Sequence, residues 1–205
     1  MVALPPTALS PTALPITLDL KGVHFTDEQF FQLCAANPNI RAERTSEGAL
    51  VLMPPVGGYS GNQELELGTD LTIWNRKTKL GKVFSSSTIF QLPNSANRSP
   101  DAAWIELSRW SALTPEQRRK FPPIAPDFVL ELRSTTDSLS ALQAKMAEYI
   151  DSGVQLGWMF NPQDGEVQIY RPNKEKEVVS IPTTLSGDPV LKGFTLQITS
   201  FDKDW

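Results

Sequence analysis

Two acidic residues lie in settings where a carboxylate could do chemistry. Glu131 lies within the apolar run Phe128-Val129-Leu130-Glu131-Leu132, whose composition predicts a strand covered on both faces. Burying a lone carboxylate there costs free energy unless something compensates its charge, and a metal ion is one such compensator. Asp101 lies at the start of another predicted strand, in the segment SPDAAWI. On adjacent strands, the two residues would present two carboxylates to one Mg²⁺ ion.

Lys145 is the third residue with this potential. It lies on the predicted helix over residues 139–151, whose apolar residues recur on one face. Lys145 borders this buried face, on the same side as Tyr149, so its ammonium could reach over the strand ends toward a bound metal. We therefore expect Asp101, Glu131 and Lys145 to form one site.

The elements that must position these residues form a mixed sheet flanked by helices. Thr26 is a predicted N-cap for a helix to about Ala36, and apolar residues at i, i+4 and i+7 predict a longer helix over about residues 60–78. No long strand–helix repeat is present, so neither a Rossmann fold nor a barrel is expected. The predicted strands cover residues 40–44, 49–53, two segments within 82–92, 102–107, 128–132, 154–160, 166–170, 178–181 and 194–198, with a helical insertion after Thr114.

The residue counts exclude several kinds of site. The chain has one cysteine, Cys34, and one histidine, His24, so neither an internal disulfide nor a zinc site of cysteine and histidine ligands can form. A serine or cysteine triad would have to use His24, which has no partner motif. A metal site would therefore use oxygen ligands, which favours Mg²⁺, Mn²⁺ or Ca²⁺.

Taken in chain order, these motifs resemble the PD-(D/E)XK nuclease superfamily, with Pro100-Asp101 as the Pro-Asp pair and Glu131 as the second acid. More closely, the chain resembles the Uma-type restriction endonuclease-like family over about residues 22–200. The segments that carry this resemblance are MPPVGGYSGNQ, SPDAAWI, PDFVLELRSTTDSL, LQAKMAEYIDSGVQLGWMFNP and VQIYRP.

The resemblance implies a mixed α/β fold with a restriction endonuclease-like core, in the order helix–three strands–helix–strand. An N-terminal antiparallel hairpin would extend this core. The implied activity is Mg²⁺- or Mn²⁺-dependent endonuclease cleavage of phosphodiester bonds in DNA. Family resemblance and the symmetry of a DNA duplex also favour paired sites, so we expect a homodimer.

The chain departs from the superfamily motif at one position. The motif places a lysine two residues after the second acid, where this chain has Arg133. Arginine can hold a phosphate but stays protonated near neutral pH, so it cannot act as a proton-transfer base. The resemblance suggests that the lysine role has moved to Lys145, with Gln143 and Tyr149 as neighbouring site residues. Lys145 would then orient the attacking water or stabilise the transition state.

Other acidic residues compete with this interpretation. Glu64 could add a carboxylate to the site, or it could simply stabilise the first turn of the long helix. Glu131 could pair with a nearby cation and have no catalytic role. A second Pro-Asp pair ends in Asp127, but Asp127 and Glu131 lie four residues apart on one strand, with Cα atoms about 13 Å apart. We therefore prefer Asp101 as the metal ligand that accompanies Glu131.

The charge of the chain supports a different class of function. Its 19 Lys and Arg and 23 Asp and Glu residues give a net charge of −4. Such a chain lacks the overall positive field that a constitutive nucleic-acid binder usually carries. The alternative is therefore a catalytically inactive nuclease-like fold that acts as a nucleic-acid or protein interaction module. A phosphoesterase that acts on small nucleotides would share the metal chemistry but would need a closed pocket.

The length of 205 residues suits a single core. Proline-rich residues 1–18 predict a flexible N-terminal arm or a strand-like segment, and residues 19–205 predict a single domain. No apolar run approaches the roughly 20 residues that a membrane span needs, and the N-terminus lacks the charged region of a signal peptide. We therefore expect a cytoplasmic protein.

Overall fold

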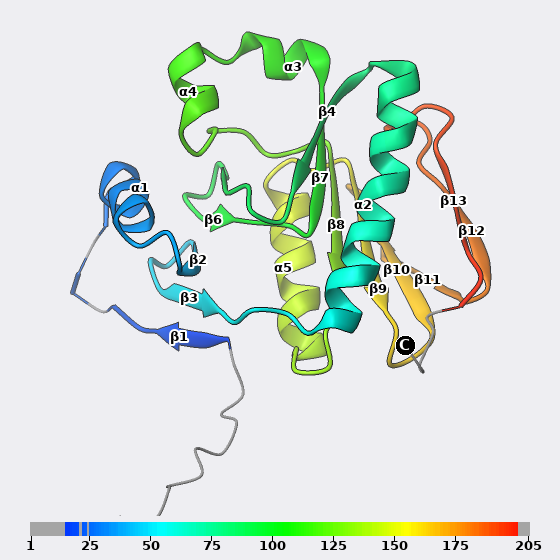
Figure 1. Cartoon of the computed structure of the whole chain (residues 1–205), viewed down its shortest axis with the longest axis horizontal. Helices are drawn as coiled ribbons and strands as arrows, with labels where there is room; N and C mark the ends of the chain where they lie inside the picture. The colour runs from blue at the N-terminus through cyan, green and yellow to red at the C-terminus, as the bar shows by residue number, and fades with distance from the viewer. Residues whose placement is uncertain (1–14, 21, 24, 201–205) are drawn as a thin grey trace, which may run out of the picture.

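The structure, a computed structural model, describes residues 15–20, 22–23 and 25–200. A six-stranded sheet lies at its centre, in the order β11-β10-β9-β8-β7-β4 (Figure 1). Strands β8 and β9 are parallel and the other neighbouring pairs are antiparallel, so the sheet is mixed, as predicted. The strands are β4 (Gly81–Ser85), β7 (Ala102–Glu106), β8 (Phe128–Leu132), β9 (Leu156–Asn161), β10 (Glu166–Tyr170) and β11 (Glu177–Ser180).

Two helices, α2 (Gly58–Thr78) and α5 (Leu139–Asp151), cover opposite faces of this sheet. Phe128 and Leu130 of β8 share a buried cluster with apolar side chains of α2, whereas Val129 shares one with apolar side chains of α5. Successive side chains of a strand point to opposite faces. The next odd-numbered residue, Glu131, therefore faces α5.

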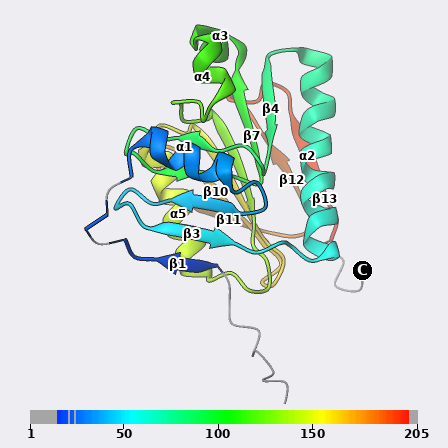
Figure 2. The ribbon, with the colours of Figure 1, turned by 60° about the vertical axis from the view of Figure 1, so that its left-hand side comes forward.

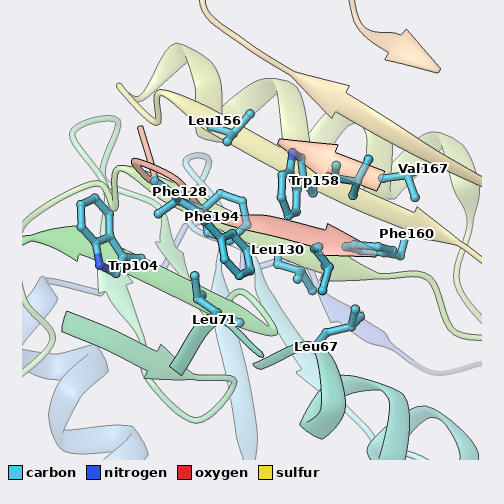
Figure 3. Close-up of a cluster of buried hydrophobic side chains, with 14 of the residues drawn as sticks. Leu67, Leu71, Trp104, Phe128, Leu130, Leu156, Trp158, Phe160, Val167 and Phe194 are labelled. Carbon is cyan, nitrogen blue, oxygen red and sulfur yellow. The ribbon is translucent and has the colours of Figure 1, made fainter. Parts of the chain in front are cut away.

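The α2 face of the sheet is closed by a C-terminal hairpin of β12 (Thr183–Ser186) and β13 (Thr195–Ile198). Phe194, next to β13, stacks on Trp158 of β9 with ring centroids 5.9 Å apart (Figure 3). Trp158 is fully buried. Burial of such large aromatic rings is a major source of stability, so this face anchors the C-terminal part of the chain to the sheet.

A second, five-stranded sheet lies beside the α5 side of the molecule, in the order β1-β3-β2-β6-β5 (Figure 2). Helix α1 (Asp27–Ala36) packs on it through Phe30, and Thr26 caps this helix as predicted. The strands are β1 (Ile16–Leu18), β2 (Arg41–Arg44), β3 (Leu50–Met53), β5 (Phe90–Gln91) and β6 (Asn97–Arg98).

The predicted helical insertion is present as two short helices, α3 (Leu107–Ala112) and α4 (Pro115–Arg119), between β7 and β8. Thr114 caps α4 with both hydrogen bonds of a capping box. None of the helices in the described part of the chain is long and apolar enough to cross a membrane.

The core follows the expected order of helix, three strands, helix and strand, here α2-β4-β7-β8-α5-β9. The N-terminal hairpin of β2 and β3 is also present, but it belongs to the larger five-stranded sheet. Strands β6 and β12 are not predicted from the sequence because such short segments carry little periodicity. Strand β1, which pairs with β3, agrees with the strand-like alternative for the end of the N-terminal arm. The division of the chain at residue 18 stays a prediction, because residues 1–14 lie outside the described residues.

Candidate active site

Asp101 and Glu131 lie on neighbouring strands, as the sequence predicts. Ala102 of β7 is opposite Leu130 of β8, so Asp101 and Glu131 occupy the next position of this antiparallel pair. The Oδ2 atom of Asp101 accepts a hydrogen bond from the backbone N–H of Leu132 at 2.7 Å. This bond fixes the Asp101 carboxylate against β8, beside Glu131.

Lys145 of α5 reaches the same position. Its Nζ atom lies 2.9 Å from Oε1 of Glu131 and 2.9 Å from Oε1 of Glu43, a residue of β2. One helical turn further along α5, the hydroxyl of Tyr149 donates a hydrogen bond to the same Glu131 oxygen at 2.9 Å. The structure thus brings Asp101, Glu131, Lys145 and Tyr149 together.

Glu43 is a member of this cluster that the sequence analysis does not predict. Its side chain is 3% exposed and accepts hydrogen bonds from the N–H of Ser99 at 2.8 Å and from Nη1 of Arg98 at 3.1 Å. A strand of sequence Arg-Ala-Glu-Arg is typical of a solvated edge, so its composition gives no signal for a buried carboxylate. The signal appears only when β2 is placed between β3 and β6, inside the second sheet.

A further ion pair extends the cluster along α5. Arg98, which contacts Glu43, also donates from Nε to Oε2 of Glu148 at 2.5 Å. Glu148 lies three residues after Lys145 on the same helix. The side chains of Arg98 and Glu148 are only 12% and 15% exposed, so this pair is shielded from solvent.

Burial dominates the electrostatics of the two predicted metal ligands. Burial raises the pKa of Asp101 well above its ordinary value, and the negative charges of Glu131 and Glu64 raise it further. The hydrogen bond from the Leu132 N–H and the charge of Lys145 lower this pKa, but by less. Burial also raises the pKa of Glu131, together with the charge of Glu43, although Lys145 and Tyr149 oppose the rise. The positive charge of Lys145 is therefore not enough to offset burial and the neighbouring carboxylates at either group.

Lys145 and Glu43 have the opposite balance. Burial alone would lower the pKa of Lys145, but the charges of Glu131 and Glu43 outweigh it and hold that pKa above its usual value. Burial alone would raise the pKa of Glu43, but Lys145, Arg98 and the Ser99 N–H together hold it below its usual value. Lys145 is therefore a protonated, charge-donating partner, and Glu43 is an ionised one.

Two other predicted residues contact different parts of the molecule. The guanidinium Nη1 of Arg133 lies 3.0 Å from Asn161 Oδ1 and 3.3 Å from Asp164 Oδ2, and the cation beside Glu131 is Lys145. The amide of Gln143 donates to Oε1 of Gln168 at 3.1 Å, so its contact is to β10 and to none of the three carboxylates.

The structure also places the two acidic residues that compete with this interpretation, Asp127 and Glu64. Asp127 pairs with Arg109 at 2.6 Å and accepts the N–H of Glu106, which gives it a structural partner on each side. Helix α2 begins at Gly58 and has no acidic residue in its first turn, so the first-turn interpretation of Glu64 is wrong. Glu64 lies in the second turn, close enough for its charge to act on Asp101. His24 lies outside the described residues.

The donor set of Asp101 and Glu131 suits a hard divalent cation. No group of three or more His, Cys, Asp or Glu side chains within the described residues is placed to hold a metal. Mg²⁺ is commonly bound by only one or two carboxylates, with waters and substrate phosphate oxygens as its other ligands. Burial and, after it, neighbouring negative charge raise the pKa of both carboxyl groups, and a divalent cation beside them would offset both effects.

The core order and the mixed sheet flanked by helices define a restriction endonuclease-like fold. A sequence profile of the Uma2 family, whose description is "Putative restriction endonuclease", matches residues 27–199. The chain therefore belongs to the Uma2 family.

A solved structure shares this fold. The chain is similar to a crystal structure described as "a putative nuclease belonging to DUF820" from Anabaena variabilis, with a TM-score of 0.72 and 19% identity. The similarity covers 86% of this chain and 97% of that one. A search of curated proteins finds no match.

Proposed function

We propose that this protein is a metal-dependent endonuclease that hydrolyses phosphodiester bonds in DNA. In this proposal Asp101 and Glu131 are the metal ligands and Lys145 is the catalytic cation. The observation that carries it is the 2.9 Å contact between the Lys145 ammonium and Glu131, directly beside the strand that carries Asp101. Membership of the Uma2 family supports nuclease chemistry in general.

Asp101 and Glu131 would hold one Mg²⁺ or Mn²⁺ ion, which when bound supplies a water of lowered pKa and positive charge beside the phosphate. The role of the protein is to hold these carboxylates rigidly. Strand pairing fixes both backbones, and the Leu132 N–H fixes the Asp101 side chain.

Lys145 acts through its charge. Its raised pKa keeps the ammonium protonated at neutral pH, so it is not a general base. As a donor of N–H bonds it can orient the attacking water, and its charge stabilises the negative charge that develops on the phosphate oxygens. Burial and the charge of Glu131 raise the pKa of Tyr149 well above its usual value, so Tyr149 stays neutral. Its O–H group orients Glu131 through a hydrogen bond.

The first test is cleavage of supercoiled plasmid DNA by the purified protein with Mg²⁺ or Mn²⁺, followed by gel electrophoresis. We expect cleavage by the wild-type protein and its loss on chelation of the metal. Asp101→Asn and Glu131→Gln keep the side-chain shape but remove a charged ligand, so both should lower the rate about 100-fold or more. A single-stranded RNA substrate in parallel distinguishes deoxyribonuclease from ribonuclease activity.

Asp127→Asn is the matched control for these variants. It also follows a proline and also loses a mostly buried carboxylate, but its partners are Arg109 and the N–H of Glu106. This variant should cleave at the wild-type rate at temperatures where it is folded. Equal cleavage by the wild type, Asp101→Asn and Glu131→Gln would reveal a contaminating nuclease and would refute the proposal.

A catalytically inactive interaction module is the second candidate function. It is favoured by Arg133, which replaces the motif lysine and whose guanidinium is bound to Asn161 and Asp164. It predicts that the protein binds nucleic acid or another protein with no turnover and no measurable affinity for Mn²⁺. A calorimetric titration in which Mn²⁺ binds the wild type but not Asp101→Asn would count against it. The cytoplasmic location stays a prediction.

A further inference from the structure

The carboxylate of Glu43 belongs to a different sheet from the two proposed metal ligands. Asp101 and Glu131 lie on or beside β7 and β8 of the six-stranded sheet, whereas Glu43 lies on β2 of the five-stranded sheet. Between the two sheets stands Lys145, whose Nζ atom is 2.9 Å from Glu43 and 2.9 Å from Glu131. The lysine is therefore the point at which the second sheet meets the proposed active site.

Glu43 is held more completely than Glu131. Three donors converge on it, namely Lys145 Nζ, Arg98 Nη1 and the backbone N–H of Ser99. On Glu131, by contrast, Lys145 and Tyr149 both contact the single oxygen Oε1. Glu43 thus has three donors of its own, whereas in the proposed function Glu131 would serve both the lysine and a metal.

Arg98 closes the contacts of Glu43 into a ring with α5. Arg98 forms ion pairs with both Glu43 and Glu148. Glu148 lies one turn of α5 from Lys145, and Lys145 forms an ion pair with Glu43, which completes the ring. Two residues of one helical turn are thereby tied to the same β2 carboxylate. A long, flexible lysine side chain normally samples many rotamers, and the ion pairs with Glu43 and Glu131 favour the one that brings Nζ to both carboxylates.

Burying this much charge is costly, and two sheets can be joined more cheaply by apolar packing. The second sheet does make such apolar contacts: Phe90 of β5 shares a buried cluster with Ala103 of β7 and Met146 of α5. The charged ring is therefore not needed to attach the sheet. What apolar residues could not supply is an acceptor that keeps the Lys145 ammonium in position.

From these contacts we infer that Glu43 is a positioning residue for the reaction: it retains the Lys145 ammonium at the site while Glu131 serves as a ligand. The inference rests on the proposed function. It also gives the N-terminal sheet a role in catalysis, since this sheet supplies the residue that holds the catalytic cation.

The test compares Glu43→Gln, Lys145→Gln and the double variant. Glu43→Gln should lower kcat for plasmid cleavage about 10- to 100-fold, the range seen when outer-shell partners are removed, with little change in KM. Because Glu43 acts through the lysine, the double variant should be no slower than Lys145→Gln alone. Glu43→Asp, which restores the charge, should recover part of the lost rate.

A second measurement does not depend on activity. Labelling with an amine-specific acylating reagent, followed by mass spectrometry, reports how accessible Lys145 is in each variant. Lys145 should be labelled faster in Glu43→Gln than in the wild type, whereas Asp127→Asn should leave the labelling rate unchanged. Thermal melts identify the temperature range in which each variant is folded.

The possible outcomes separate the two proposals. Additive rate losses in the double variant, or unchanged labelling of Lys145 in Glu43→Gln, would overturn the positioning role of Glu43. A wild-type protein that cleaves no substrate would overturn the proposed function. In that case faster labelling in Glu43→Gln would still establish that Glu43 holds the lysine, and unchanged labelling would refute both.

Discussion

At the scale of single residues, the site contains more negative than positive charge. Glu43, Asp101, Glu131 and Glu148 supply four carboxyl groups, and the cations that contact them are Lys145 and Arg98. The shortage of positive charge affects Asp101 most. Burial and the charge of Glu131 raise the pKa of Asp101 well above its ordinary value. Glu43, with three donors, has a lowered pKa because those donors outweigh its burial.

This contrast predicts opposite pH dependences of stability for two variants in the absence of metal. The pKa of Asp101 is raised in the folded state. Its contribution to the free energy of unfolding is therefore fully present below its unfolded pKa of about 4, and it is lost as the pH rises through the folded pKa. Asp101→Asn should therefore gain stability relative to the wild type as the pH rises above about 4, by up to about 1.4 kcal/mol per pH unit. Urea denaturation with a chelator present measures this difference.

Glu43→Gln serves as the comparison in the same experiment. The pKa of Glu43 is lowered on folding, so its stabilising contribution is present above its unfolded pKa and is lost as the pH falls through the lower folded value. This variant should therefore be less stable than the wild type at neutral pH, and the deficit should shrink in acid. Parallel pH curves for the two variants would contradict the assigned charge states.

At the scale of elements, Asn75 joins the end of α2 to the first strand of the core. Its side-chain amide donates to the carbonyl of Gly81, and its Oδ1 atom accepts the N–H of Gly81 and the indole N–H of Trp104. These bonds require the backbone of β4 to pass close to Trp104 of β7. A glycine satisfies this requirement because it has no Cβ atom.

Gly81→Ala should therefore lower the free energy of unfolding, by about 1–3 kcal/mol for an overpacked site. An added Cβ atom would overlap the carbonyl oxygen of Ile105 and the indole ring of Trp104, both parts of the paired strand β7. Chemical denaturation followed by circular dichroism measures the change.

Gly68→Ala is the control for this prediction. Gly68 lies inside α2, and a Cβ atom there would meet nothing within 4 Å. Since alanine favours a helix over glycine by about 0.5–1 kcal/mol, this variant should be as stable as the wild type or more stable. Equal stability of both alanine variants would show that β4 and β7 can separate without cost.

At the scale of the whole molecule, the site is assembled where two sheets and α5 meet. The six-stranded sheet contributes Glu131, the five-stranded sheet contributes Glu43, and the helix between them contributes Lys145 and Tyr149. The net charge of −4 therefore includes carboxylates that are buried around the site. A bound divalent cation would reduce this local excess, so the charge balance weighs mainly against tight DNA binding without metal.

We predict that the protein is a homodimer, because a two-fold symmetric enzyme can present one site to each strand of a duplex. Size-exclusion chromatography with light scattering at micromolar concentration should give twice the chain mass of 22.7 kDa. In plasmid cleavage, a dimer with two active sites should form linear DNA with little nicked intermediate. A monomeric mass with only nicked product would disprove the dimer.

The sequence by itself determined the elements of the core and which residues face one another across β7, β8 and α5. Helical and strand periodicity, the cap at Thr26 and an acid within an apolar strand are local signals, and they suffice to bring Asp101, Glu131 and Lys145 together. The order of the core follows from the family resemblance instead, because β4 pairs with β7 although β5 and β6 lie between them in the chain.

Only the tertiary structure decided the rest of the site. Glu43 and Ser99 lie 56 positions apart in the chain, and a four-residue strand does not specify its partner over such a distance. The same reason applies to Gln143 and Arg133, whose partners on β9, β10 and the turn between them lie 25 to 31 positions away. Pairing between distant segments depends on the packing of the whole chain, so it determines which charged residues become buried beside Lys145.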